Sequence, residues 1–477
     1  MIAGLIFERS KLNKQYYEVT GPAESLEILK DKLTLVNKSI EWAIYDANNS
    51  MKFWKSQGDN EFVNGKVNEI ALNIENLTPQ LTEEYYGERD GKLVVPAGYW
   101  NYAEKVVGDD HLNTLLKPKF VPGLRHYQTE AITALMLYKR ATCVLGTGLG
   151  KTMVISSIVL TALEEGLRVL IVVPSEYLIK QVVETVSRYT DSITSASATR
   201  HISLGKSVLV TTPITAKKYA DIYDVIIIDE SHRSAASSWT SLLSDVEKAE
   251  YVYNLTATPF RADGLDLAIH AFGGPVVFSR DAKWGIQNGW LANFDVYTYR
   301  FSSYKDGRQV VCGDKTKKPM AYGKIVGNKD FLMNVLPMIV KAYNNGRKIM
   351  VIFKSLKPAE ILKKLLDKEG IDTQVANGEY KLPLVKFAND ESRLLLATDK
   401  LISEGVDIPG ADVLFVLTQH SSPVTTYQSI GRVLRKAKDK KKPLIIDIEA
   451  TGYRGFQSAG EKRLEIYKDL ADTVSKN

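Results

Sequence analysis

Short apolar runs alternate with amphipathic segments in two stretches of the chain, one from about residue 120 and one from about residue 348. The runs are 169–173, 208–210 and 225–228 in the first stretch, and 348–353, 394–397, 413–417 and 443–447 in the second. Continuous apolar strands separated by helices are typical of a parallel sheet that is covered on both faces. The pattern therefore predicts two α/β domains in tandem.

The first 115 residues have a different, mixed pattern. Tyr16–Thr20 and Lys92–Val95 are predicted as strands, and Pro22 opens an amphipathic helix that carries Leu29 and Leu33. We expect a small α+β domain here. The predicted divisions are 1–115 for this domain, 116–280 and 281–450 for the two α/β domains, and 451–477 for a helical tail.

Composition limits the class of protein. Hydrophobic residues make up 44% and charged residues 25% of the 477 residues, as in an ordinary soluble globular protein. No apolar run approaches the ~20 residues of a membrane span, and Glu8 brings a charge too early for a signal peptide. Cys143 and Cys312 are the only cysteines and indicate neither a disulfide framework nor a metal site, so a cytoplasmic location is expected. The net charge of +6 permits a nucleic-acid partner without requiring one.

A glycine-rich turn follows the apolar residues Cys143–Leu145, and a helical pattern begins directly after it. Such a loop can wrap a phosphate, because glycines free the backbone and the amides at the helix start point at the anion. The strict phosphate-loop pattern has glycine where Leu145 stands. The residues expected to hold the phosphates of ATP are Gly146, Thr147, Gly148, Gly150 and Lys151, and Thr152 is expected to hold Mg²⁺.

Two adjacent carboxylates, Asp229 and Glu230, end the apolar run 225–228. Ligands of α/β proteins bind at the carboxyl ends of parallel strands, so both side chains are expected to face a ligand. We expect Asp229 to hold Mg²⁺ and Glu230 to orient and deprotonate the attacking water. Taken alone, the pair fits a capping Asp and a surface Glu equally well, and the phosphate loop upstream favours the catalytic interpretation.

The order of these two motifs along the chain resembles that in the superfamily 2 helicases. The first motif of that family does not require glycine at the position of Leu145. The resemblance implies two tandem RecA-like domains, with Arg125 and Gln128 at the adenine. It also implies that Thr256 and Thr258 couple hydrolysis to movement. Backbone contacts of the first domain with nucleic acid are expected from Pro174, Ser175, Gln181, Thr211 and Thr212.

The second α/β stretch supplies further motifs of this family. Gln428, Arg432 and Arg435 match Gln-x-x-Gly-Arg-x-x-Arg, and the two arginines are expected on one side of a helix, aimed at the γ-phosphate. A salt-bridged surface helix is the simpler alternative. The family also implies ATP contacts from Gly405 and Asp407, and nucleic-acid contacts from Lys354, Ser355 and Thr398. His232 with Gln428 suits the DExH branch, in which such residues link the two domains, so ATP would be fully enclosed only when the domains close.

Between the motifs, the sequence is most similar to phage branch-migration helicases of the UvsW type. That resemblance implies a DNA partner that is forked or branched, with fork regression, branch migration and unwinding in replication, recombination or repair. The polar segment 301–325 carries Lys305, Arg308, Lys315, Lys317 and Lys318, and is expected to be an exposed hairpin that separates or grips DNA, or else a solvated basic loop. The Lys436–Lys442 run is expected to be a solubilising loop. The alternatives are an RNA helicase, a restriction-type translocase subunit and a nonhydrolytic binding scaffold.

Overall fold

The computed structural model describes residues 1–9, 16–36, 44, 48, 51, 61–77, 82–84, 86–89, 92–96, 105–107, 116–196, 206–231, 242, 249–258, 270–271, 273–377, 382–403, 410–437 and 440–476. These residues form two compact units, Met1–Val144 with Lys151–Ser279, and Leu145–Gly150 with Arg280–Asn477. Each unit is described by itself below.

A small α+β domain begins the chain, as its sequence predicts. Its elements are β1 (Ile6–Arg9), β2 (Tyr16–Thr20), α1 (Ala23–Leu33), β3 (Thr34–Val36), α3 (Glu61–Leu77), β4 (Thr82–Glu84), β5 (Gly87–Arg89), β6 (Lys92–Pro96) and β7 (Lys105–Val107). The sheet order is β5-β6-β2-β1-β7, with β7 parallel to β1 and the other neighbours antiparallel. Alternate residues Tyr17 and Val19 of β2 are buried, as are Leu29 and Leu33 of α1, which is the apolar spacing expected of each element.

The first α/β domain contains a seven-stranded sheet in the order β10-β11-β9-β12-β13-β8-β14. Its strands are β8 (Arg140–Leu145), β9 (Val169–Val172), β10 (Ile193–Ser195), β11 (Val208–Thr211), β12 (Val225–Asp229), β13 (Tyr251–Thr256) and β14 (Val276–Arg280). The pairs from β10 to β8 are parallel. Every residue of β8, β9, β11, β12 and β13 is buried, which explains the continuous apolar runs.

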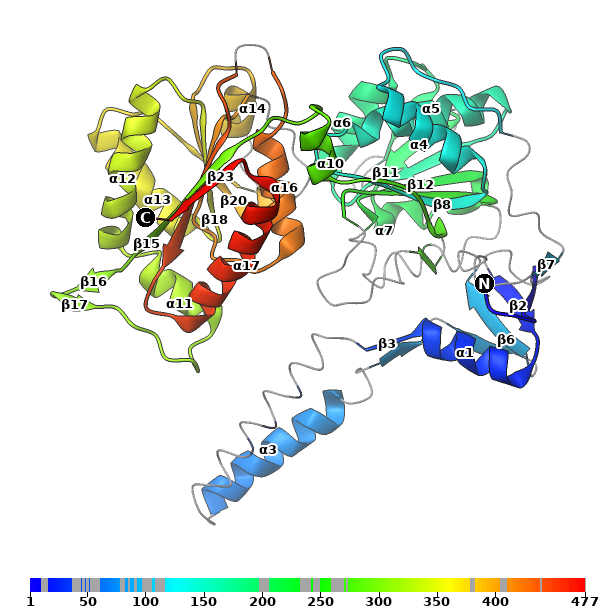
Figure 1. Ribbon diagram of the computed structural model, residues 1–477, viewed down its shortest axis with the longest axis horizontal. Coiled ribbons are helices and arrows are strands. Elements are labelled where there is room, and N and C mark those ends of the chain that lie inside the picture. The colour runs from blue at the N-terminus through cyan, green and yellow to red at the C-terminus, as the bar shows by residue number, and fades with distance from the viewer. Residues whose placement is uncertain are drawn as a thin grey trace. The chain divides into compact units, whose positions relative to one another are not determined.

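Helices cover this sheet. They are α4 (His126–Met136), α5 (Lys151–Glu164), α6 (Glu176–Val186) and α7 (Pro213–Ala216), with a short 3₁₀ helix at Ala220–Ile222. Helix α5 packs beside both α4 and α6, and these three helices line one face of the sheet (Figure 1). Helix α5 is apolar on most sides, with buried residues from Val154 to Ala162, so it forms the centre of that layer.

The second α/β domain has a fully parallel seven-stranded sheet in the order β19-β20-β18-β21-β22-β15-β23. Its strands are β15 (Asp295–Phe301), β18 (Ile349–Phe353), β19 (Val375–Ala376), β20 (Leu394–Thr398), β21 (Val413–Val416), β22 (Leu444–Ala450) and β23 (Thr473–Lys476). The four apolar runs predicted here are confirmed as β18, β20, β21 and β22. The two tandem RecA-like domains that the family resemblance implies are therefore present.

Helices cover both faces of the second sheet. They are α10 (Ala282–Gln287), α11 (Lys318–Ile325), α12 (Lys329–Asn344), α13 (Leu356–Lys368), α14 (Leu382–Ala388), α15 (Asp399–Ser403), α16 (Pro423–Val433) and α17 (Arg454–Leu470). Helices α12 and α13 pack together on one face, and α16 and α17 on the other (Figure 1). The sequence predicts 451–477 as a helical tail. The structure shows α17 followed by β23, which pairs with β15 in the sheet.

The segment 301–325 is a hairpin followed by a helix. Strands β16 (Tyr304–Lys305) and β17 (Arg308–Gln309) pair antiparallel and are exposed. Asp306 and Gly307 both have positive φ, 51° and 73°, which is the geometry of a two-residue hairpin turn. The remainder of the segment is anchored: the Cys312 N–H donates to the Gly452 carbonyl at 2.8 Å, and α11 begins at Lys318.

Candidate functional site

The glycine-rich loop turns tightly between β8 and α5. Gly148 and Gly150 have φ of 89° and 84°, a conformation in which any side chain is strained. The Leu149 N–H donates to the Gly146 carbonyl at 3.0 Å, and α5 starts at Lys151. The loop therefore has the left-handed turns and the following helix start that a phosphate site requires. Thr147 is buried, whereas the side chain of Thr152 is half-buried.

The Lys151 ammonium and the Glu230 carboxylate form an ion pair, with Nζ and Oε1 3.1 Å apart. Their side chains are 11% and 13% exposed, so the pair is largely withdrawn from water. Glu230 has φ of 53°, a left-handed conformation that costs a non-glycine residue about 1–3 kcal/mol and that clusters at functional sites. The structure thus brings together the two residues that the sequence predicts to act on one phosphate.

Asp229 is the last residue of β12 and is 5% exposed. Its Oδ1 accepts a hydrogen bond of 3.0 Å from the Glu230 N–H. Burial, followed by the negative charge of Glu230, raises the pKa of Asp229 to about 6, although the positive charge of Lys151 lowers it. A buried carboxylate whose negative charge is only partly offset by nearby positive charge is a suitable ligand for a cation.

No cluster of three or more His, Cys, Asp or Glu side chains suited to a metal ion occurs among the described residues. The donor set at Asp229 fits Mg²⁺ better than a transition metal, because Mg²⁺ uses one or two protein oxygens and completes its shell with water and phosphate oxygens. Asp229 and Thr152 are the residues that would hold it.

The two residues predicted to contact the adenine, Arg125 and Gln128, lie at the start of α4. Gln128 is 2% exposed, and its side-chain oxygen accepts a hydrogen bond of 2.9 Å from the Arg125 N–H. The Arg125 guanidinium donates to the Tyr127 hydroxyl at 2.8 Å. This arrangement caps the helix and holds Gln128 in one orientation. The adenine contact of Arg125 and Gln128 stays a prediction.

The nucleic-acid residues predicted in the first domain differ in exposure. Pro174 and Ser175 are half-buried at the start of α6, and Gln181 is half-buried one turn later. Thr212 is half-buried at the start of α7. Thr211, by contrast, is fully buried, and its hydroxyl donates to the Ala196 carbonyl at 2.9 Å. The structure gives the Thr211 side chain a role in the fold rather than at a phosphate.

The Thr-Ala-Thr element is locked by its own hydrogen bonds. The Thr256 hydroxyl donates to the Thr258 carbonyl at 2.7 Å and accepts from the Thr258 N–H at 3.3 Å. Both threonines are buried at the end of β13, next to β12 and Asp229 in the sheet. The two predicted coupling residues therefore lie beside the strand that carries Asp229. His232, Gly405 and Asp407 lie outside the described residues.

Helix α16 carries Gln428 and Arg432, which are 3% and 4% exposed. The prediction that Arg435 shares this helix is wrong. The helix ends at Val433, and Arg435 forms a β-bridge with Leu291, while the Ala292 N–H donates to the Leu434 carbonyl at 2.8 Å. The helix ends two residues before Arg435, because Arg435 pairs with Leu291 instead of continuing the helix.

Lys354 and Thr398 lie at the carboxyl ends of β18 and β20. Lys354 is 57% exposed and pairs with Asp399, with Nζ and Oδ2 3.1 Å apart. Ser355 is exposed at the start of α13, and Thr398 is buried. Beside them lies a cavity of about 310 Å³, lined in part by Lys318, His420 and Ser422. In the sequence, Lys318 is one basic residue among several in the segment 301–325, and no motif includes His420 or Ser422.

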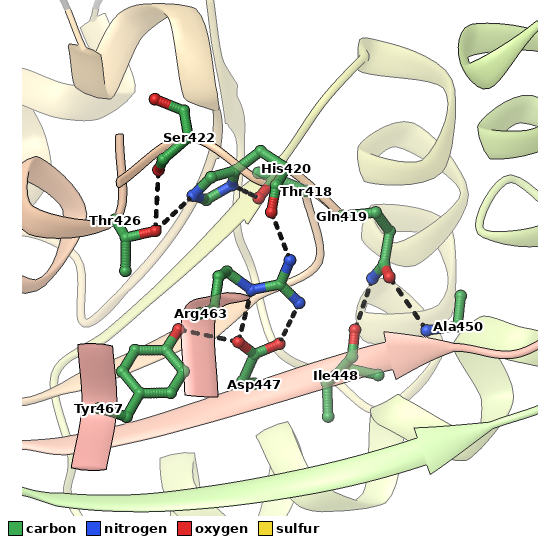
Figure 2. Close-up of polar contacts among 10 residues, drawn as sticks. All are labelled: Thr418, Gln419, His420, Ser422, Thr426, Asp447, Ile448, Ala450, Arg463 and Tyr467. Atoms are coloured by element: carbon green, nitrogen blue, oxygen red, sulfur yellow. Dashed lines mark hydrogen bonds and ion pairs between the residues drawn. The ribbon is translucent and has the colours of Figure 1, made fainter. Parts of the chain in front are cut away.

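A buried polar network holds one wall of this cavity (Figure 2). The Arg463 guanidinium donates to both oxygens of Asp447, at 2.7 and 2.8 Å, and Tyr467 donates to the same carboxylate at 2.8 Å. A third nitrogen of Arg463 donates to the His420 carbonyl at 2.6 Å. Burial, followed by the nearby positive charge of Arg463, lowers the pKa of His420 to about 3, so the imidazole is neutral at physiological pH.

Comparison with known proteins gives two family matches. The family "Type III restriction enzyme, res subunit" matches residues 122–261, and "Helicase conserved C-terminal domain" matches residues 329–437. DNA 3'-5' translocase XPB2 from Sulfurisphaera tokodaii is 26% identical over 387 residues, which cover 73% of this chain and 86% of that protein. The chain spans 42%, 64% and 53% of the length of three further curated relatives.

Solved structures share the fold. A fragment assigned as the HsdR subunit of a type I restriction enzyme from Vibrio vulnificus YJ016 has a TM-score of 0.58 at 20% identity, covering 75% of this chain and 69% of that one. Dbp5 of S. cerevisiae, bound to RNA and ADP BeF3, has a TM-score of 0.55 at 17% identity, covering 74% and 89%. T4 UvsW aligns over 99% of both chains with a TM-score of only 0.38, so the UvsW-type assignment stays a prediction.

No helix among the described residues has the length and apolar content needed to cross a bilayer. The two family matches follow each other in the order of a helicase core, on two tandem parallel sheets. Together with the relative XPB2, these matches support an ATP-dependent helicase or translocase of superfamily 2.

Proposed function

We propose that this protein uses ATP hydrolysis to move along DNA and remodels forked or branched DNA, by fork regression, branch migration and unwinding. The observation that carries the ATPase part is the Lys151–Glu230 ion pair beside the buried Asp229. The branched-DNA part rests on the sequence resemblance. The similarity to DNA 3'-5' translocase XPB2 supports DNA as the nucleic acid along which this protein moves.

The ion pair suggests how ATP would switch the site. An incoming triphosphate competes with Glu230 for Lys151, because both are anionic partners of one ammonium. Once Lys151 turns to the phosphates, the Glu230 carboxylate becomes available to orient a water molecule. It would accept a proton from that water as the water oxygen bonds to the γ-phosphorus and the bond from this phosphorus to the β–γ bridging oxygen breaks, which leaves ADP and inorganic phosphate. Mg²⁺ held by Asp229 and Thr152 would neutralise phosphate charge when bound.

Arg432 and Arg435 are proposed to stabilise the charge of the transition state. Arginines in this role raise rates by about 10³ to 10⁵. Lys151 belongs to the first α/β domain and the two arginines to the second. Nucleic acid that is held by both domains would therefore be shifted as the arginines bind and release the γ-phosphate in each cycle. Gly405 and Asp407 are proposed as further ATP contacts, and His232 with Thr256 and Thr258 as the coupling residues.

The test is ATP-dependent activity on matched forked, four-way and flush duplex DNA, together with RNA of the same sequences. A Lys151→Ala variant serves as the inactive control. We expect turnover stimulated by DNA and lost in the variant, with forked and four-way substrates processed faster than flush duplex. Equal or greater stimulation by RNA would favour the RNA-helicase alternative. Turnover that is unchanged in a Glu230→Gln variant would exclude the proposed catalytic mechanism.

A further inference from the structure

Arg435, one of the two arginines proposed to stabilise the transition state, lies just beyond the end of α16. The helix ends at Val433, and Leu434 is its C-terminal cap. The last carbonyls of a helix have no partner within the helix and must accept hydrogen bonds from other groups. The position of the Arg435 backbone therefore depends on the groups that donate to this short segment.

Three successive carbonyls of the segment accept hydrogen bonds from outside the helix. The Lys440 ammonium donates to the Val433 carbonyl at 2.6 Å and to the Arg435 carbonyl at 2.8 Å. The Leu434 carbonyl, which lies between them in sequence, accepts from the Ala292 N–H at 2.8 Å. One ammonium thus holds the backbone on both sides of Leu434, and a positive charge is also favoured at the C-terminus of a helix.

Lys440 differs in burial from its neighbours in the lysine-rich run 436–442. Lys440 is half-buried, whereas the other lysines of the run that the structure describes are exposed, namely Lys436, Lys441 and Lys442. Burial lowers the pKa of Lys440 to about 8, although the negative charge of Asp412 raises it. A lysine that served only solubility would keep its ammonium in water and avoid this cost. Its bonds to the arginine segment give a reason for the burial.

We propose that Lys440 is a positioning residue for ATP hydrolysis, because it holds the backbone from which the Arg435 side chain extends. The proposal rests on the proposed function, in which Arg435 stabilises the charge of the transition state. Lys440 is proposed to act through Arg435 and not to touch the nucleotide itself. It follows the range 329–437 that matches the helicase C-terminal family, so this contact lies beyond the motif that contains Arg435.

The loss of Lys440 should affect the transition state more than the bound substrate. Arg435 is expected to act on the charge that develops as the bond between the γ-phosphorus and the β–γ bridging oxygen breaks. Loss of an interaction that is made only in the transition state lowers kcat and leaves KM unchanged. A shift of about 1 Å in a catalytic group can lower a rate about 100-fold. We therefore expect a large change in kcat and a small one in KM.

The test is a double-mutant cycle in the full-length protein, measured as DNA-stimulated ATP turnover. The variants are Lys440→Met, Arg435→Ala and their combination. Lys441→Met is the matched control, because the Lys441 ammonium donates to the Asn345 carbonyl instead. Lys440→Met should lower kcat at least about tenfold and leave KM within about twofold. In the Arg435→Ala background it should have no further effect, because residues that act as a unit are not additive. Lys441→Met should change neither constant.

A second measurement separates positioning from a loss of folded structure. ADP with aluminium fluoride mimics the phosphoryl group in transfer, so its affinity depends on the arginines more than that of ADP does. In the presence of DNA, Lys440→Met should bind ADP as the wild type does. It should bind ADP with aluminium fluoride at least about tenfold more weakly. Equal losses of affinity for both would overturn the proposal, by showing that Lys440 only stabilises the fold.

The double-mutant cycle also separates this proposal from the proposed function. An unchanged kcat in Lys440→Met would overturn the positioning role. Additive reductions of kcat by the two substitutions would overturn it as well, because Lys440 would then act independently of Arg435. Both results would leave the proposed function intact. Turnover that is unchanged in Arg435→Ala would contradict the proposed function itself and, with it, this proposal.

Discussion

Replacing Asp229 by asparagine is expected to stabilise the first unit while abolishing magnesium-dependent ATP hydrolysis. Burial raises the pKa of Asp229 from 3.8 to about 6, so the folded state favours the protonated carboxyl more than the unfolded chain does. The penalty for the ionised form is therefore complete above pH 6 and disappears below pH 3.8. Asparagine avoids it and retains an oxygen that can accept the Glu230 N–H.

The magnitude follows from the difference between the two pKa values. At pH 7.5 the ionised Asp229 destabilises the folded state by about 3 kcal/mol, and at pH 4.5 by about 1 kcal/mol. Only 5% of Asp229 is exposed, so screening by solvent reduces this value little. The Asn variant should thus be more stable at pH 7.5, and its advantage should shrink as the pH falls through 6.

Hydrogen exchange of the β12 peptide, measured with thermal unfolding at both pH values, tests this expectation. Asp191→Asn is the control, because Asp191 is an exposed carboxylate of the same unit and should show no such change. A variant that is less stable at pH 7.5, or whose gain in stability does not depend on pH, would refute the reasoning. The first result would mean that the fold stabilises the ionised form of Asp229, and the second that the gain does not come from its charge.

Two further predictions concern basic residues of the second unit. Reversing the charges of Lys305 and Arg308, both exposed on the hairpin, should lower the number of base pairs unwound per ATP about fivefold on forked DNA. An unchanged number would favour the alternative, in which this segment is only a solvated basic loop. Lys440 donates to the Val433 and Arg435 carbonyls at 2.6 and 2.8 Å, so Lys440→Met should speed amide exchange in the last turn of α16 about tenfold. Lys441→Met, which removes a bond to Asn345 instead, should leave that turn unchanged.

Local pattern predicts the buried strands well and the edge strands poorly. Strands β9, β12, β18 and β21 are buried at every position. Apart from Asp229 at the end of β12, all their side chains are apolar, so the runs are visible in the sequence. Strand β23 pairs with one neighbour and is half-exposed. Its sequence, Thr-Val-Ser-Lys, contains no run, because its place in the sheet depends on pairing with β15 rather than on its own composition.

The candidate site shows the same division. Lys151 begins α5 after the loop that follows β8, and Glu230 directly follows β12. Both strands belong to one parallel sheet, separated only by β13, so both residues are expected at its carboxyl edge, as the sequence predicts. The cavity beside Lys318 combines residues from a helix start, a strained turn and α17, which no spacing in the sequence relates. Lys440 was expected to be solubilising, but its two carbonyl partners become apparent only once α16 is seen to end at Val433.

Strained backbone occurs after the central strand of each α/β sheet. In the described part of the chain, four non-glycine residues have positive φ, and two of them, Glu230 and Gln419, follow the central strands β12 and β21 of the two sheets. Each such residue costs about 1–3 kcal/mol, and neither is a turn residue that tolerates the conformation easily. Glu230 is held by its pair with Lys151, and Gln419 by its bonds to Ile448 and Ala450. Glu230 directly follows Asp229, the end of β12, whereas Gln419 is the third residue after Val416, the end of β21. Glycine would remove the strain at Glu230, so its retention beside Lys151 is consistent with a site for the phosphates of ATP.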